Sequence, residues 1–210
     1  MIPSSVLDQI VQFQAPNVFN PWASSDPLDI YGVTASAHRL ARLAQHFDCN
    51  PRYMLIGEAP GYQGCHFSGV PFTNEALLLR GVVPRVPCVI RITTRARPWS
   101  EPSATIVWDT LHKLGIADCT VMWNAFAWHP YRSRGGLYSN RAPNLSELTE
   151  GAPVLRAVVE SFKDARIIAV GNVAEWILHK FEIKVHAKVR HPSMGGANKF
   201  RIQMSELFGG

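Results

Sequence analysis

Four short segments of the chain have the length and apolar character of buried β-strands. They lie at 53–56, 120–123, 166–170 and 184–189. Each is followed by a glycine or a polar residue, and short segments with such boundaries are typical of strands in the interior of a sheet.

Between these segments, apolar residues recur at helical spacing. In 34–47 they are Ala37, Leu40, Leu43, Ala44 and Phe47. Further helices are predicted at 74–79, 103–114, 153–162, 172–180 and 197–207, with Pro153 in the first turn of the third. The polar segment 131–146 is predicted to be a loop. Residues 1–30, which contain four prolines, are predicted to be a wrapping segment with one short helix.

Strands that alternate with helices predict an α/β fold in which helices cover both faces of a parallel sheet. Ligands of such sheets bind at the carboxyl ends of the strands. Those ends are expected at Glu58, Asn124, Gly171 and His191. Three of the four bring a polar side chain to the same rim, which is therefore the predicted functional site.

Composition is that of an ordinary globular protein. The chain has 210 residues, of which 47% are hydrophobic and 18% charged, so we expect one domain spanning 1–210. It contains no run of about 18 apolar residues, so no membrane span is expected. Residues 1–20 lack the pattern of a signal peptide, so we expect a cytoplasmic protein.

The net charge of +5 permits a polyanionic partner without requiring one. Five arginines fall within a proline-broken stretch and could either meet phosphates or form a solvated loop: Arg80, Arg85, Arg91, Arg95 and Arg97. The four cysteines, Cys49, Cys65, Cys88 and Cys119, form no Cys-x-x-Cys pair. We expect free thiols there and no metal or cofactor.

Residues 57–61, Gly-Glu-Ala-Pro-Gly, follow the first predicted strand directly. Two glycines and a proline favour a tight turn, in which backbone N–H groups can approach a ligand closely. The turn is neither a dinucleotide-binding fingerprint nor a phosphate-binding loop with Gly-Lys-Ser/Thr.

Five short motifs together resemble the uracil-DNA glycosylase superfamily. They are Gly-Glu-Ala-Pro-Gly at 57–61 with Gly-Val-Pro-Phe at 69–72, Asn124, Asn-Arg-Ala-Pro at 140–143, Gly-Asn-Val-Ala at 171–174 and His-Pro-Ser at 191–193. They occur in order and at predicted strand ends. The resemblance implies a three-layer sandwich with a central four-stranded parallel sheet flanked by helices.

The resemblance also implies a pocket for a base flipped out of DNA. Its residues would be Gly57, Ala59, Tyr62, Phe72 and Ser193. Phe72 would stack on the base, although its residue type alone favours a core position. Asn124, whose amide can both donate and accept, would read the base edge, and Tyr62 would exclude a methyl group.

His191 would donate a hydrogen bond to the departing base, which gains negative charge as the glycosidic bond breaks. The apolar Met194 would enter the DNA minor groove as a wedge, with ordinary packing as the alternative. Lys199, Arg141 and Arg95 would contact phosphates. The pair His129-Pro130 either contacts DNA or the pocket, or begins the loop after the second strand.

The branch of the superfamily best known for uracil removal differs from this chain at two positions of the first motif. Ala59 replaces the aspartate that orients the attacking water, and Gly61 replaces a bulky tyrosine. Glu58 is the only carboxylate in the motif. It either polarises water, or bonds the turn and positions the base, and the sequence leaves both open.

The first motif looks most like that of the iron–sulfur branch of the superfamily. That branch has a cluster cysteine where this chain has Trp128, and its paired N-terminal cysteines have no counterpart here. We therefore predict no cluster, which an iron assay or an absorbance band near ~400 nm would refute.

The sequence thus predicts a monomeric, monofunctional DNA glycosylase that excises uracil or a related deaminated base, with nucleoid association when it is bound to DNA. Its catalytic residues would be Glu58, Asn124 and His191. A glycosylase for hypoxanthine, xanthine or another lesion is one alternative. A non-catalytic DNA-binding module and a base-binding protein are others.

Overall fold

The computed structural model describes residues 2–86 and 90–209. Its central sheet contains four strands, β2 (Tyr53–Gly57), β3 (Thr120–Asn124), β5 (Arg166–Val170) and β6 (Ala187–Val189), in the order β3-β2-β5-β6. All neighbouring strands are parallel, which confirms the predicted sheet. The last strand is shorter than predicted, because it begins at Ala187 instead of 184.

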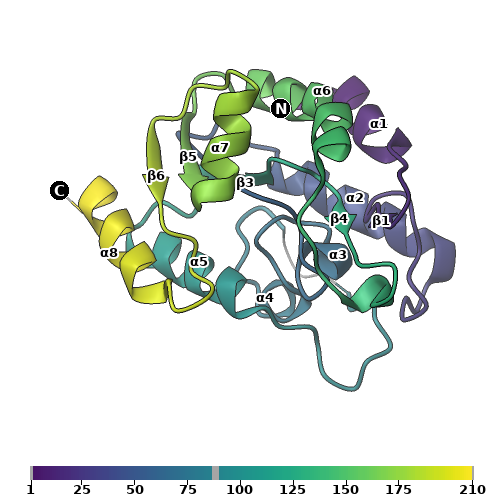
Figure 1. Ribbon diagram of the computed structural model, residues 1–210. Helices are drawn as coiled ribbons and strands as arrows, with labels where there is room; N and C mark the ends of the chain where they lie inside the picture. The colour runs from purple at the N-terminus through teal and green to yellow at the C-terminus, as the bar shows by residue number, and fades with distance from the viewer. Residues whose placement is uncertain (1, 87–89, 210) are drawn as a thin grey trace.

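Helices cover both faces of this sheet, so the molecule has three layers (Figure 1). One face packs against α1 (Ser4–Gln12), α2 (Ala35–His46), α6 (Leu145–Ser161) and α7 (Asn172–Lys180). The other packs against α4 (Glu75–Leu79), α5 (Pro102–Lys113) and α8 (Ala197–Phe208). The short helix α3 (Cys65–Ser68) follows the turn after β2.

Alternate residues of each strand enter different hydrophobic cores. In β2, Met54 and Ile56 belong to the core under α1, α2, α6 and α7. Leu55, between them, belongs to the core under α4, α5 and α8. Because side chains alternate between the faces of a strand, an apolar run is what a sheet with two covered faces requires.

Helix α6 differs most from its predicted bounds. It begins at Leu145, inside the predicted loop 131–146, and Pro153 lies within it instead of in its first turn. Asn144 and Glu147 form a reciprocal capping box, with Glu147 N–H donating to Asn144 Oδ1 and Asn144 N–H donating to Glu147 Oε2. This cap and the buried apolar face hold the helix through Pro153.

The N-terminal segment is tied to the chain that follows β3. Strand β1 (Val18–Phe19) pairs antiparallel with β4 (His129–Pro130), so these two residues form a strand and do not begin the expected loop. Residues Ile2, Val6 and Ile10 are buried in the core, and Trp22 Nε1–H donates to Gly69 O. Residues 2–22 are therefore built into the fold.

The strand order places a topological switch point between β2 and β5. The chain leaves β2 for β3 on one side and returns across it to β5 on the other. Open α/β sheets bind ligands at the carboxyl ends of the strands that flank such a point. Within the described part of the chain, no helix is long and apolar enough to span a membrane.

Candidate active site

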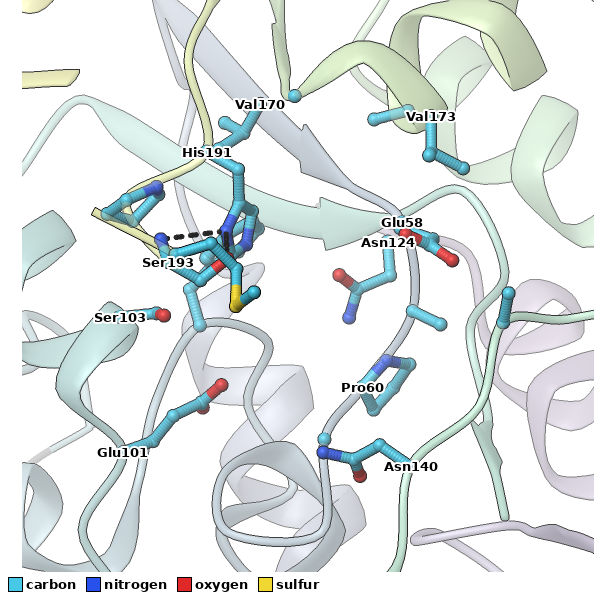
Figure 2. A pocket seen from close by; sticks show the side chains of 18 of the residues that line it. Glu58, Pro60, Glu101, Ser103, Asn124, Asn140, Val170, Val173, His191 and Ser193 are labelled. Atoms are coloured by element: carbon cyan, nitrogen blue, oxygen red, sulfur yellow. Dashed lines mark hydrogen bonds between the residues drawn. The ribbon is translucent and has the colours of Figure 1, made fainter. Parts of the chain in front are cut away.

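A cavity of about 1100 Å3 opens at the switch point (Figure 2). Its walls come from the turn after β2, the ends of β3 and β5, the segments 132–142 and 190–194, and the start of α5. Glu58, Asn124 and His191 all line it. The structure therefore brings together the three side chains predicted at the rim of the sheet.

Gly57, predicted to bind the base, ends β2 and is not among the residues that line the cavity. It pairs in register with Asn124 of β3. A Cβ atom at Gly57 would lie 2.4 Å from Phe72 Cζ and 2.9 Å from Asn124 Oδ1. Only glycine therefore allows the aromatic ring and the amide to approach the strand from the two sides.

Phe72 and Asn124 bring an aromatic ring and an amide close to the backbone of Gly57. Phe72 lines the cavity and also belongs to the hydrophobic core under α5, so both predicted environments apply to it. Its φ of 51° is left-handed, which is uncommon for an aromatic residue and occurs more often at functional sites. The Asn124 amide has no hydrogen bond to any described residue, although only 4% of the residue is exposed.

His191 is held as a neutral hydrogen-bond donor. The backbone N–H of Ser193 donates to His191 Nδ1 at 3.1 Å, and Ser193 Oγ lies 2.7 Å from the same nitrogen. Since Nδ1 accepts, the proton of a neutral ring lies on Nε2. Burial, with the nearby Arg190, lowers the pKa of His191 to about 4, so the ring is neutral at pH 7. Nε2–H is left free to donate.

Glu58 follows Gly57 and faces the cavity (Figure 2). Its carboxylate makes no hydrogen bond to the turn or to another described residue, while its backbone carbonyl accepts from Phe126 N–H. Burial raises the pKa of this carboxyl. Ala59, beside it, also lines the cavity and adds no polar group. The sequence left two roles open for Glu58, and the hydrogen bond to the turn that one of them requires is absent among the described residues.

Met194 is at the tip of the loop after His191. It is 90% exposed and has a φ of 51°, while Gly195 beside it has a φ of 75°. A Cβ atom at Gly196 would lie 2.1 Å from His191 O, so the loop folds back tightly on itself. Met194 thus presents a large, exposed apolar side chain on a tight loop at the edge of the cavity.

Three other predicted site residues do not line the cavity. Tyr62 does not line the cavity, because its ring packs edge-on against Trp99 at 5.6 Å. Arg95 is exposed and stacks on the same tryptophan ring, with its guanidinium carbon 3.9 Å from the Trp99 centroid. Lys199 is exposed in the first turn of α8, outside the cavity wall.

Arg141 is committed to internal contacts, although it lines the cavity. It forms a bidentate ion pair with Glu147 at 2.6 and 2.7 Å. It also donates to the carbonyls of Tyr131, Ala142 and Asn17. Of the clustered arginines, Arg85 is similarly used, since it donates to three backbone carbonyls. The guanidinium groups of these two arginines are therefore used in contacts within the protein and are not free to bind phosphates.

The sequence reasoning missed several polar groups of the cavity. Glu101, at the start of α5, and the exposed Arg132 line it, and so do Asn140 and Arg190. Arg190 stands next to His191, and Asn140 begins one of the recognised motifs, so these two could have been proposed. Glu101 lies in the proline-rich arginine stretch, where no motif or periodicity marks it.

A buried chain of hydrogen bonds supports the Asn140 side of the cavity. We call it the Asp26 chain, and it consists of Tyr138, Asp26, His66, His129 and Asn140. Tyr138 Oη–H donates to Asp26 at 2.9 Å, His66 Nε2 lies 3.0 Å from Asp26, and the two histidine Nδ1 atoms are 2.9 Å apart. His129 Nε2 then reaches Ser139 O and Asn140 Oδ1, and that oxygen also accepts from Tyr62 N–H.

The donors and acceptors of this chain are consistent only if a proton lies between Asp26 and His66. His129 must donate from Nε2 to a carbonyl, so its Nδ1 accepts from His66, whose Nε2 faces the carboxylate. Burial alone would raise the pKa of Asp26, but bonds from His66, Leu28 N–H and Tyr138 lower it. Burial lowers the pKa of His129 to about 3 and keeps that ring neutral.

The described residues include no group of three His, Cys, Asp or Glu side chains able to hold a metal ion. Cys49, Cys65 and Cys119 are free thiols, and Cys88 lies outside the described residues. Trp128, at the position of the cluster cysteine, is buried and stacks on Phe13 with ring centroids 3.6 Å apart. These residues do not fit an iron–sulfur cluster.

Comparison with known proteins agrees with this geometry. A sequence model described as the Uracil DNA glycosylase superfamily matches residues 44–208. Among curated proteins no match was found. Among solved structures, the crystal structure of wild-type SMUG2 from Pedobacter heparinus is similar, with a TM-score of 0.60 and 15% identity over 97% of this chain and 95% of that chain. At this identity the likeness concerns the fold alone.

Proposed function

The chain belongs to the Uracil DNA glycosylase superfamily, and from this premise we propose that it binds DNA containing a deaminated base and hydrolyses the bond between base and sugar. The observation that carries the proposal is the convergence of Phe72, Asn124 and the free Nε2–H of His191 on one cavity. These supply a stacking surface, a reading amide and a donor for the leaving group.

Base recognition rests on Phe72 and Asn124. A flipped base stacks on the ring, which is worth about 1–3 kcal/mol per base. The Asn124 amide, which no described residue satisfies, then donates to a carbonyl of the base and accepts from its ring N–H. A base that lacked this pair would leave the buried amide unpaired, at a cost of about 1–3 kcal/mol.

Bond cleavage rests on His191. As the bond from the sugar C1′ to the base breaks, its electron pair moves onto the base and the negative charge spreads to the ring oxygens. The neutral His191 ring donates from Nε2 to such an oxygen without giving up its proton. A donor of this kind is worth roughly 10²–10³-fold in rate.

The attacking water is assigned to Glu58. Its carboxylate faces the cavity and has no hydrogen-bond partner among the described residues, and Ala59 beside it offers no polar side chain. Glu58 accepts a hydrogen bond from the water and orients its lone pair toward C1′. As the new C–O bond forms, the surplus proton of the water passes to the carboxylate or to solvent.

DNA binding is assigned to the rim of the cavity. Met194 fills the space that the flipped base leaves, and the exposed Arg132 and the nearby Arg190 neutralise phosphates. Lys199 and Arg95, both exposed, extend this basic surface. Affinity should therefore fall as salt rises.

A panel of oligonucleotides, each with one uracil, hypoxanthine, xanthine or thymine, tests the proposal in single-stranded and duplex form. We expect base release and an alkali-labile abasic site with uracil, and loss of most activity in Asn124→Ala and His191→Ala. A protein that binds these oligonucleotides in a salt-dependent way but releases no base from any of them is the non-catalytic DNA-binding module.

A further inference from the structure

Glu101 is a carboxyl group in the cavity that the proposed mechanism does not use. It is the N-terminal cap residue of α5, but its side chain makes no capping bond to the helix. The carboxyl instead lines the cavity, on the opposite side from Glu58 and Asn124 (Figure 2).

Two glycines of the turn after β2 make room for this carboxyl. A Cβ atom at Gly64 would lie 2.1 Å from Glu101 Oε2, so no other residue fits there without a shift. A Cβ atom at Gly61 would lie 3.5 Å from both Glu101 Oε1 and Asn140 Nδ2. Gly61 thus lies next to both polar groups, and a side chain at this position would be in contact with the Glu101 carboxyl and the Asn140 amide.

The carboxyl of Glu101 has no hydrogen bond or ion pair with any described side chain. The other titratable residues that line the cavity are Glu58, Cys65, Arg132, Arg141, Arg190 and His191. Burial, uncompensated by a cation, raises the pKa of Glu101 to about 7. The protonated acid is therefore well populated at neutral pH, and it has a proton to donate.

A flipped base offers three edges to this cavity. The edge attached to the sugar faces the DNA, and a second edge faces Asn124. In a base that pairs with Asn124, the third edge would face the opposite wall. Glu101 lies on that wall (Figure 2). In uracil this third edge carries two C–H groups, which would leave a buried carboxyl unpaired. In a purine it carries the acceptor N7, to which a protonated carboxyl can donate.

We propose that Glu101 is a further catalytic residue that adapts the cavity to deaminated purines, by donating a hydrogen bond to N7 of hypoxanthine or xanthine. The inference rests on the proposed glycosylase function and names a substrate class for the same site. Asn124 pairs with the N1–H and O6 of such a base, so both polar edges of the buried base have hydrogen-bond partners.

The proton moves as the bond breaks. Protonated Glu101 transfers its proton to N7, the C1′–N9 bond breaks, and its electron pair stays on the base. The purine leaves neutral, with a hydrogen on N7. Water adds to C1′ and loses a proton to Glu58 or to solvent, and Glu101 regains a proton from solvent. No other reactant is needed.

Single-turnover release of hypoxanthine and of uracil from otherwise identical oligonucleotides tests the inference. We expect the wild-type protein to release both bases. In Glu101→Ala, the ratio of hypoxanthine to uracil release should fall about 10²-fold, the scale of general acid catalysis. Glu101→Gln, which can donate but cannot transfer a proton, should keep the wild-type KM for hypoxanthine DNA and lose kcat. Glu160→Gln, on the exposed last turn of α6, is the matched control.

The pH profile gives an independent readout. Because the protonated carboxyl is the active form, wild-type hypoxanthine release should decline as pH rises through about 7. Uracil release should not share this decline, and Glu101→Gln should lack it.

Each outcome is decisive. Release of uracil without any deaminated purine, or an unchanged ratio in both Glu101 variants, overturns the inference and leaves the proposed function standing. Release of neither base by the wild-type protein overturns both. Thermal unfolding of each variant verifies that an altered ratio does not come from misfolding.

Discussion

Two polar regions border the same cavity, and they differ in how completely they are bonded. In the Asp26 chain, every member has a partner at 2.9–3.2 Å, from Tyr138 through to Asn140. The second region, which we call the open set, consists of Glu58, Glu101, Asn124 and the Nε2 side of His191. Its groups have no partner among the described residues.

The difference separates architecture from function. A buried polar group without a partner costs free energy, so groups that only hold a fold are expected to be satisfied. The open set instead lines the cavity, where Glu58, Glu101 and His191 are partly exposed, so its groups are available to a bound base. Changes to the Asp26 chain should therefore act on stability, and changes to the open set should act on activity.

The largest effect is expected for His191→Ala. Loss of the Nε2–H donor should reduce single-turnover uracil release by roughly 10²–10³-fold, with the melting temperature nearly unchanged. His179→Ala, on the exposed face of α7, is the control. A variant that unfolds, or one that keeps wild-type activity, would break the distinction between the two regions.

Asp26→Asn tests the other side of the comparison. It replaces the carboxylate that shares a buried proton with His66 by a neutral amide, so we expect a loss of about 3 kcal/mol in the free energy of unfolding, measured by urea denaturation. Asp164→Asn, on an exposed turn, is the control. The folded-state pKa of Asp26 is lowered, so its contribution is present above pH 4 and the difference should shrink as pH falls further. If the variant kept full stability and lost activity, the assignment of the Asp26 chain to stability would be wrong.

Glu101→Gln should make the protein more stable at pH 8. Burial raises the pKa of this carboxyl from 4.5 to about 7, so ionisation favours the unfolded state between those values. The full penalty, up to about 3 kcal/mol, is present above pH 7 and vanishes below pH 4.5. Urea unfolding of both proteins at pH 8 and below pH 4.5 measures this penalty. A variant less stable than wild type at pH 8 would show that the carboxylate has a stabilising role.

Met194→Ala should have the smallest effect. Because the side chain is 90% exposed, stability should not change. Release from duplex DNA should fall roughly tenfold, about 1.4 kcal/mol, while release from single-stranded DNA stays near wild type, since no stacked neighbour has to be displaced. Equal losses on both substrates would favour a packing role.

The sheet and the rim of the cavity could be predicted because both follow from local pattern. The apolar runs fixed three strands nearly to the residue, and the positions after them identified Glu58, Asn124 and His191. The capping box at Asn144 was also readable, but the proline at 153 drew the predicted start of α6 too far along the chain.

The remainder depends on contacts that no local pattern encodes. Arg141 and Tyr62 were predicted from their places in or beside the motifs, yet ion pairing with Glu147 and packing on Trp99 decide where they point. Glu101 reaches the cavity only because Gly64, far from it in sequence, has no side chain. Such long-range proximity is visible only in the folded structure.

The central claim is that the open set excises a base. The most direct test is to incubate an oligonucleotide containing one uracil with excess wild-type protein and with Asn124→Ala, and to measure free uracil and alkali-labile sites. The account predicts one uracil released per abasic site by the wild-type protein, and a loss of most release by the variant. Equal release by both proteins, or an intact oligonucleotide with the wild-type protein, would contradict it.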